Sequence, residues 1–188
     1  MNYTSKFFNK KLLKVLLFLP LLASLLPFEI NPAKAALEFQ WDQSSGYKTL
    51  KWYQRTAEKN SRNKLFLFFR PSDRKTGLLS INLKIPKKYN QKLKQNNITF
   101  CKAKIGNYTA KSKCLEEIPS DIVLNKETQR LEIYPISPVP SDKDTYAVVF
   151  KITNPQRYGM FQFHSFGKSS GPIPVSSYLG SWTINIDP

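Results

Sequence analysis

Hydrophobic and polar residues alternate along much of the chain with the two-residue period of a β-strand. In residues 78–85, Leu79, Ile81, Leu83 and Ile85 fall on one face and the polar residues fall on the other. Alternating or short apolar runs predict strands at 37–41, 64–69, 78–85, 98–105, 121–124, 130–134, 146–153, 160–166 and 179–186. Turn signals rich in Pro, Gly, Asn and Asp separate these runs. The pattern predicts a single all-β domain, an Ig-like antiparallel β-sandwich.

Two segments depart from the strand pattern. Residues 52–59 and 87–95 each have a composition compatible with a short helix, and Pro86 marks the start of the second. We therefore expect one or two short helices beside the sheets. No internal repeat or interdomain linker is visible, so one domain is the economical interpretation.

The N-terminal 35 residues have the three-part pattern of a secretory signal peptide. Four lysines and no acid lie in residues 1–14, residues 15–28 are nearly all apolar, and Ala33-Lys34-Ala35 follows. We expect cleavage after Ala35, which leaves a mature domain at 36–188. The apolar run is shorter than the roughly 20 residues of a spanning helix, so a retained anchor is the less favoured alternative. The predicted location is the periplasm or cell envelope, with the thylakoid lumen as a further option, and no integral membrane segment after cleavage.

The two cysteines, Cys101 and Cys114, both lie in the mature segment. In an oxidising compartment they are expected to form a disulfide that closes a hairpin or loop. The alternatives are free thiols or a metal site with His164, but no C-x-x-C or H-x-x-x-H spacing supports a metal. We predict no metal and no cofactor.

Positive charge is concentrated in one half of the mature chain. Overall, 29 basic residues face 13 acidic ones, a formal charge of +16. Residues 43–115 hold 18 basic and two acidic residues, whereas 116–188 hold six basic and eight acidic ones. The candidate anion-binding residues are Lys84, Lys87, Lys88, Lys92, Lys94, Arg70, Arg74 and Lys75.

A field of this kind can attract an anionic polysaccharide, lipid head groups or an acidic protein. Export makes nucleic acid a poor target. The alternative is compositional bias, because 23 of the 29 basic residues are Lys, which lacks the bidentate geometry of Arg. Asp73, between Arg70 and Arg74, is expected to form local ion pairs.

No set of residues forms a coherent catalytic constellation, so we predict no catalytic residue. Residues 167–171 read G-x-S-x-G, but Pro172 follows where a hydrolase would begin a helix. We interpret this segment as a turn. His164 has no visible nucleophile in the sequence nearby and is expected to be structural. The acids at 116–117, 121, 142 and 144 suit turns and caps, with a glycosidase pair as the alternative.

Three motifs are familiar together: Arg-Pro-Ser-Asp-Arg-Lys-Thr at 70–76, Asn-Pro at 154–155 with Tyr-Gly-Met-Phe-Gln-Phe at 158–163, and Tyr-Leu-Gly-Ser-Trp at 178–182. With the leader, they resemble the exported cyanobacterial proteins grouped as domain of unknown function 2808. The resemblance covers most of the mature chain. It implies an exported, single-domain, β-rich protein and supplies no activity.

Three functions follow as hypotheses. The leading one is a non-enzymatic exported protein that associates with an anionic envelope component or acidic partner through its Lys-rich half. The second is a hydrolase of envelope polysaccharide that uses a carboxylate pair. The third is a lumenal accessory subunit of a membrane complex.

Overall fold

The computed structural model describes residues 47–90, 93–107 and 109–188. The predicted signal peptide, its cleavage site at Ala35, the expected strand Leu37–Trp41 and Lys92 lie outside the described residues. Within the described ranges, no helix is long and apolar enough to cross a membrane.

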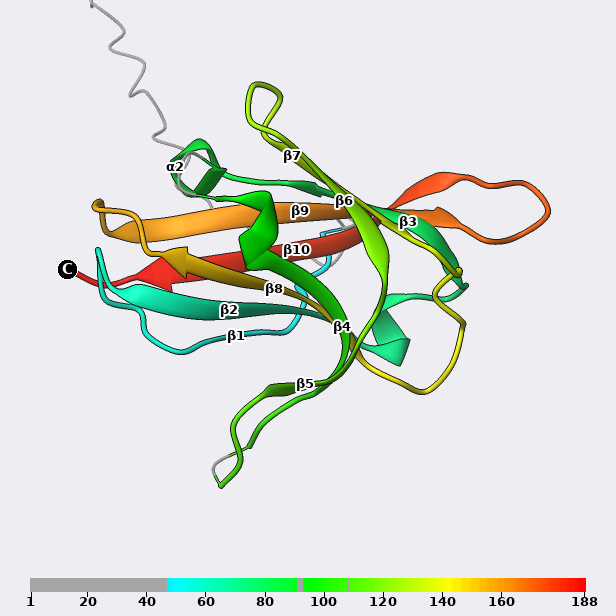
Figure 1. The fold of residues 1–188 in the computed structure, drawn as a ribbon, viewed down its shortest axis with the longest axis horizontal. Helices are drawn as coiled ribbons and strands as arrows, with labels where there is room; N and C mark the ends of the chain where they lie inside the picture. Colours follow the sequence, from blue (N-terminus) through cyan, green and yellow to red (C-terminus); the bar gives the residue numbers. More distant parts are fainter. Residues whose placement is uncertain (1–46, 91–92, 108) are drawn as a thin grey trace, which may run out of the picture. The chain divides into compact units, whose positions relative to one another are not determined.

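Two five-stranded antiparallel sheets make up the described domain (Figure 1). The first, called the β2 sheet, has the order β1-β2-β8-β4-β5, and the second, called the β9 sheet, has the order β10-β9-β3-β7-β6. The strands of the β2 sheet are β1 (Trp52–Gln54), β2 (Arg62–Phe69), β8 (Tyr146–Thr153), β4 (Ile98–Lys104) and β5 (Lys113–Glu117). Those of the β9 sheet are β10 (Ser176–Ile186), β9 (Gly159–Ser169), β3 (Leu78–Lys84), β7 (Arg130–Pro135) and β6 (Ser120–Asn125).

The hydrophobic core lies between the two sheets, because each strand turns alternate side chains inward. Leu65, Leu67 and Phe69 of β2 belong to the same buried cluster as Phe163 of β9 and Trp182 of β10. The Trp182 ring meets Phe69 edge to face at 5.1 Å, and its indole N–H donates to the Lys51 carbonyl at 3.1 Å. This arrangement confirms the predicted β-sandwich.

A second buried cluster covers the outer face of the β2 sheet. Phe66 and Phe68 lie there with Cys101 and Ala103 of β4, all of them at most 5% exposed. Cys101 forms the predicted disulfide with Cys114, and their Cα atoms are 5.7 Å apart. The disulfide joins the β4–β5 hairpin beside this cluster. It therefore anchors β5, which has no buried residue of its own, to the well-buried strand β4.

The helix predicted at Trp52–Lys59 is wrong. Trp52–Gln54 is the edge strand β1, paired antiparallel with β2. The Lys51 carbonyl accepts hydrogen bonds from both the Phe68 backbone and the Trp182 indole, which ties the segment to both sheets. Helical composition at the surface is overridden by these tertiary contacts.

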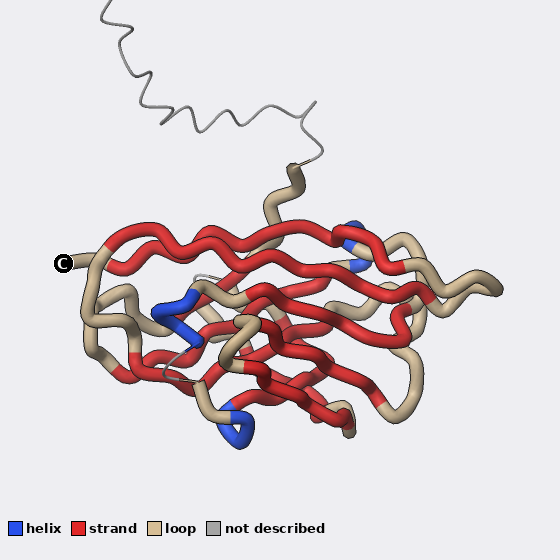
Figure 2. The backbone as a smooth tube through the Cα atoms, turned by 90° about the horizontal axis from the view of Figure 1, so that it is seen from above, coloured by secondary structure: helices blue, strands red, loops and turns tan. Residues whose placement is uncertain are grey.

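The other helix prediction is correct only in part. Helix α2 spans Lys87–Asn90, and short 3-10 helices span Gln95–Asn97 (η4) and Pro71–Asp73 (η3). Figure 2 shows that these helical segments are short against the strands. Tyr89 is buried edge to face against Phe161 and Phe163, and Leu93 is also buried. The segment is held by these two anchors instead of by a long helix.

Two details of the strands were not predicted. Strand β5 (Lys113–Glu117) was missed because it is largely exposed and lacks an apolar alternation. In β3, a register shift between Leu78 and Ser80 buries Leu78, so that Leu79 is only half-buried. The other inward residues of this strand, Ile81 and Leu83, are buried as the alternation predicts.

Candidate anion-binding site

A basic pocket of about 360 Å³ lies where β2 begins, β8 ends and the chain enters β4. Its lining is rich in cations and amides and contains no acid: Arg62, Asn63, Lys94, Asn97, Lys151, Ile152 and Thr153. We call this set the basic pocket. Its volume falls in the range of small-ligand sites.

The register of β2 against β8 places like charges side by side next to the pocket, which Lys151 lines. Lys64 of β2 lies directly opposite Lys151 of β8, and Arg62 lies opposite Thr153. Like charges directly opposite on neighbouring strands repel each other. The Lys64 ammonium lies 5.0 Å from the centre of the Phe66 ring, which gives it a weak internal partner. A bound anion would relieve the repulsion that the fold leaves at this position.

A buried pair of amides lies beside the pocket, and one of its members, Asn63, lines the pocket. The Asn63 side-chain amide donates to the Asn154 side-chain oxygen at 2.9 Å, and Asn154 is fully buried. Asn154 donates in turn to the carbonyls of Thr56 (3.1 Å) and Glu58 (2.7 Å). The Asn63 side-chain oxygen accepts from the Arg55 backbone N–H at 3.0 Å. These bonds fix the ends of β2 and β8, so the pocket walls are preorganised.

The basic residues of the pocket take part in none of the salt bridges of the described residues. In the part of the chain that the structure describes, the salt bridges use Lys48, Arg70, Arg74 and Lys102 as cations. None of the basic residues around the pocket belongs to that set. The positive potential of the pocket is therefore available to a ligand.

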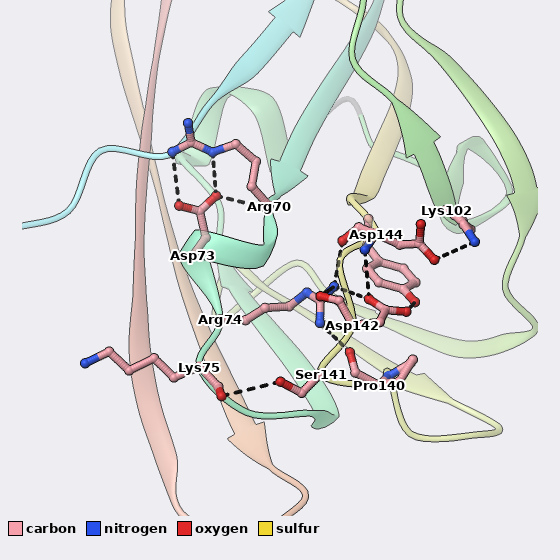
Figure 3. Close-up of polar contacts among 10 residues, drawn as sticks. Arg70, Asp73, Arg74, Lys75, Lys102, Pro140, Ser141, Asp142 and Asp144 are labelled. Carbon is pink, nitrogen blue, oxygen red and sulfur yellow. Dashed lines mark hydrogen bonds and ion pairs between the residues drawn. The ribbon is translucent and has the colours of Figure 1, made fainter.

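Arg74, predicted to bind anions, is instead an internal structural group (Figure 3). The residue is only 3% exposed, and its guanidinium donates to the Pro140 carbonyl, the Asp142 carboxylate (2.6 Å) and the Asp144 carbonyl (2.6 Å). It also lies 4.7 Å from the centre of the Tyr146 ring. Its charge is used to join the segment after β2 to the start of β8.

Arg70 forms the local ion pair expected around Asp73. Its guanidinium makes two bonds to the Asp73 carboxylate, at 2.9 and 3.1 Å, as Figure 3 shows. The Asp73 carboxylate is fully buried, and Lys48 adds a cation 3.4 Å away. Lys75 is exposed beside this network, and its carbonyl accepts a hydrogen bond from Ser141. Arg70, like Arg74, therefore mainly stabilises the fold.

The predicted lysine cluster is distributed over three places. Lys84 ends β3 opposite Arg130 of β7, whereas Lys87 and Lys88 are exposed in α2. Lys94 lines the basic pocket. Sequence reasoning missed Arg62, Lys64 and Lys151, because their proximity depends on the pairing of β2 with β8. The available signal was the presence of a basic residue on the exposed face of both predicted strands.

His164 has a partner that the sequence did not reveal. Its ring Nδ1 lies 2.7 Å from the Ser181 hydroxyl, which lies 2.6 Å from the Tyr178 hydroxyl. Desolvation, with a contribution from Lys84, lowers the pKa of His164, which favours the neutral ring. Ser181 is only 1% exposed, so this cluster bridges β9 and β10 inside the structure.

The other chemical motifs of the sequence are engaged in local structure. Ser169 of the G-x-S-x-G segment ends β9, and its hydroxyl accepts from the Val175 backbone N–H at 3.2 Å. Asp142 bonds Arg74, and Asp144 pairs with Lys102 at 2.5 Å. Among the described residues, no group of three or more His, Cys, Asp or Glu side chains gathers as a metal site would require.

The Arg70–Asp73 pair predicts a pH-dependent stability. Desolvation alone would raise the pKa of Asp73, but the bonds and charges of Arg70 and Lys48 lower it below its usual range. A depressed pKa adds stability above the unfolded pKa of about 4, and this stability is lost as the pH falls through the folded value. The Asp73→Asn variant should therefore be less stable than the natural protein at pH 7, with a difference that shrinks steadily below about pH 4.

Urea unfolding at a series of pH values measures this difference. The control is Asp121→Asn, an exposed acid of β6. A gap between natural and Asp73→Asn proteins that is as large at pH 2 as at pH 7, or absent at both, would contradict the assigned role of the ion pair.

Two facing antiparallel sheets with a basic pocket at one end define a β-sandwich protein with a candidate anion site. The chain belongs to the family described as Protein of unknown function (DUF2808), whose model matches residues 39–186. This confirms the resemblance drawn from the three motifs. No curated protein matches the sequence.

Solved structures align with this chain at low identity, including the three that follow. The bacterial hydrophobin BslA is 14% identical, with a TM-score of 0.48 over 74% of this chain and 91% of its own. The collagen-binding domain of a Staphylococcus aureus adhesin is 12% identical, with a TM-score of 0.40 over 74% and 97% of the two chains. A family 123 glycoside hydrolase from Clostridium perfringens is 14% identical, with a TM-score of 0.31 over 69% of this chain and 22% of its own.

Proposed function

We propose that the protein is a non-enzymatic, exported binding protein that holds an anionic polysaccharide of the cell envelope in its basic pocket. The observation that carries the proposal is the grouping of Arg62, Lys94 and Lys151 around a pocket that no acid lines. Carboxylate or sulfate groups on a polymer would accept hydrogen bonds from these cations. The half-buried amide of Asn97 adds neutral donors and an acceptor that suit sugar hydroxyls.

Only part of the Lys-rich half carries basic side chains that are free to bind an anion. Arg70 and Arg74 are engaged with acids, whereas Arg62, Lys94 and Lys151 are exposed at the strand ends. Lys84, Lys87 and Lys88 extend positive charge from β3 into α2. A polymer bound in the pocket could gain long-range attraction from these lysines without direct contact. Lys64 lies opposite Lys151 across the β2–β8 pair, which adds positive charge beside the pocket.

A carboxylate-pair hydrolase has less support from the described residues. A second pocket of about 670 Å³ lies between β1 and the β4–β5 loop, and it is lined by Lys51, Tyr53, Gly106, Asn107, Thr109, Ala110, Lys111 and Ser112. Neither this pocket nor the basic pocket is lined by Asp or Glu. Of the candidate acids, Asp142 is paired with Arg74 and Asp144 with Lys102.

Binding to a charged polymer and its neutral counterpart tests the proposal. Exported protein should bind dextran sulfate and not dextran, and the affinity should fall by at least about tenfold between low and high salt, because salt screens exposed charges. Calorimetric titration measures both. Equal binding to the two polymers, or an affinity unchanged by salt, would contradict the proposed electrostatic recognition.

A further inference from the structure

Apolar side chains gather at the end of the sandwich opposite the basic pocket. The turn between β9 and β10 exposes Ile173 by 79% and Val175 by 56%, and Ile136, after β7, is exposed by 77%. Pro172 and Pro174 are also exposed in the same turn. We call these five residues the apolar end. In Figure 1 the β9–β10 hairpin (orange to red) projects away from the end that carries the C-terminus.

This end is built from ordered loops that hold one another. The Ser170 backbone N–H donates to the Gly77 carbonyl at 2.9 Å, and Leu78 exchanges backbone hydrogen bonds with Val139 at 2.9 Å. A side chain at Gly77 would meet the Ser170 hydroxyl at 2.5 Å and the Val139 carbonyl at 2.8 Å. The loops before β3, after β7 and after β9 therefore form one contiguous surface. The exposed apolar groups are held outward on it.

The backbone of the turn suits an environment poor in water. Pro172 and Pro174 have no backbone N–H, which removes two donors that would otherwise need a partner. The Val175 carbonyl accepts from the Ser169 backbone, and the Val175 N–H donates to the Ser169 hydroxyl. Burial of polar backbone groups without partners is costly in lipid. Several backbone N–H and C=O groups of the turn are thus hydrogen-bonded or absent, so they do not oppose burial.

The charge around the β9–β10 turn of the apolar end favours an anionic surface. Residues 167–177 and 135–141 contain no acid. Lys168 and Lys75 are exposed beside the turn, and the nearby Asp73 and Asp142 carboxylates are paired with arginines. Apolar groups at a tip with lysines behind them match a membrane interface, where acyl chains lie beneath anionic head groups.

We propose that the apolar end inserts into the interface of a membrane that contains anionic lipids. Ile173 and Val175 enter the acyl boundary, while Lys168 and Lys75 contact the head groups. Strand β2 spans eight residues from the basic pocket to this end, a length of about 25 Å at the usual rise per residue. The pocket would then face away from the membrane, toward polymers outside it. This inference stands on different residues from the proposed polymer binding.

Binding to vesicles tests the insertion with variants of the exported protein. The vesicles contain phosphatidylcholine alone or equal parts of phosphatidylcholine and phosphatidylglycerol. The Ile173→Ser/Val175→Ser double variant should bind the mixed vesicles at least about tenfold more weakly than the natural protein, since it loses two apolar contacts. The matched control is Val123→Ser, because Val123 is 50% exposed on β6 and lies outside the apolar end. It should bind like the natural protein.

A local probe separates insertion by this turn from membrane contact by any other segment. Tryptophan introduced by Ile173→Trp should be quenched by brominated acyl chains in mixed vesicles beyond the quenching of the native tryptophans. Tryptophan introduced by Val123→Trp should add no quenching. Absence of extra quenching at position 173, or unchanged vesicle binding of the double variant, would overturn the proposal. Binding of the turn to a protein in place of lipid would give this same negative result.

Discussion

Asp142→Ala is expected to lower the free energy of unfolding by about 3 kcal/mol. The Asp142 carboxylate accepts hydrogen bonds from the Arg74 guanidinium (2.6 Å), the Tyr146 hydroxyl (2.7 Å) and the Asp144 backbone N–H (3.1 Å). Its removal leaves Arg74, which is only 3% exposed, without its charge partner. We place the effect at the low end of the range for broken buried pairs, since 31% of the Asp142 side chain reaches solvent.

Urea unfolding of the two proteins measures the loss. Glu117→Ala, an exposed acid of β5, is the matched control and should change the free energy of unfolding by less than about 0.5 kcal/mol. Replacing both partners, as Arg74→Met/Asp142→Leu, should recover much of the loss because no buried charge then remains. Equal stability of Asp142→Ala and the control would mean that the Arg74 network does not hold the strand ends together.

The sandwich itself could be predicted because its strands carry a period-two signal. In β9, the alternating residues Phe161, Phe163 and Ser165 are buried, and His164 on the opposite face is only partly buried. In β1 the same signal is absent over three residues, and helix-like composition misled the prediction. That segment is a strand because Lys51 and Trp52 contact residues far along the chain, which local patterns do not encode.

The sequence predicted that the candidate site is basic, but not which residues form it. Net charge indicated an anionic partner. The position of Arg70 and Arg74 in a basic stretch of the sequence wrongly suggested that they are free to bind an anion. Arg70 pairs with Asp73, which is close to it in the sequence. Arg74 pairs with Asp142, which is far away in the sequence, and only the fold brings these two residues together. The pocket brings together Arg62 of β2 and Lys151 of β8, which are 89 positions apart in the sequence. Such a grouping requires the strand pairing, which the single sequence does not determine.

Removing the charges of the basic pocket is expected to have the largest effect on binding. Each of Arg62, Lys94 and Lys151 is exposed, so its contact with an anion should contribute about 1 kcal/mol. The triple variant Arg62→Gln/Lys94→Gln/Lys151→Gln should therefore bind dextran sulfate about a hundredfold more weakly. Unfolding in urea should show that the fold is retained, since these side chains take part in none of the salt bridges of the described residues.

A matched variant isolates the pocket from net charge. Lys104→Gln/Lys113→Gln/Lys143→Gln removes the same number of exposed cations, and none of them lines the basic pocket. It should lose only the small part of the affinity that depends on long-range attraction. The two variants have equal charge, so any difference between them reflects position.

The most direct test of the account is calorimetric titration of dextran sulfate into the natural protein and these two triple variants at one salt concentration. The account predicts a loss of about a hundredfold in affinity for the pocket variant and near-natural affinity for the matched variant. Equal losses in the two variants would show that charge alone attracts the polymer, and would contradict a binding site at Arg62, Lys94 and Lys151.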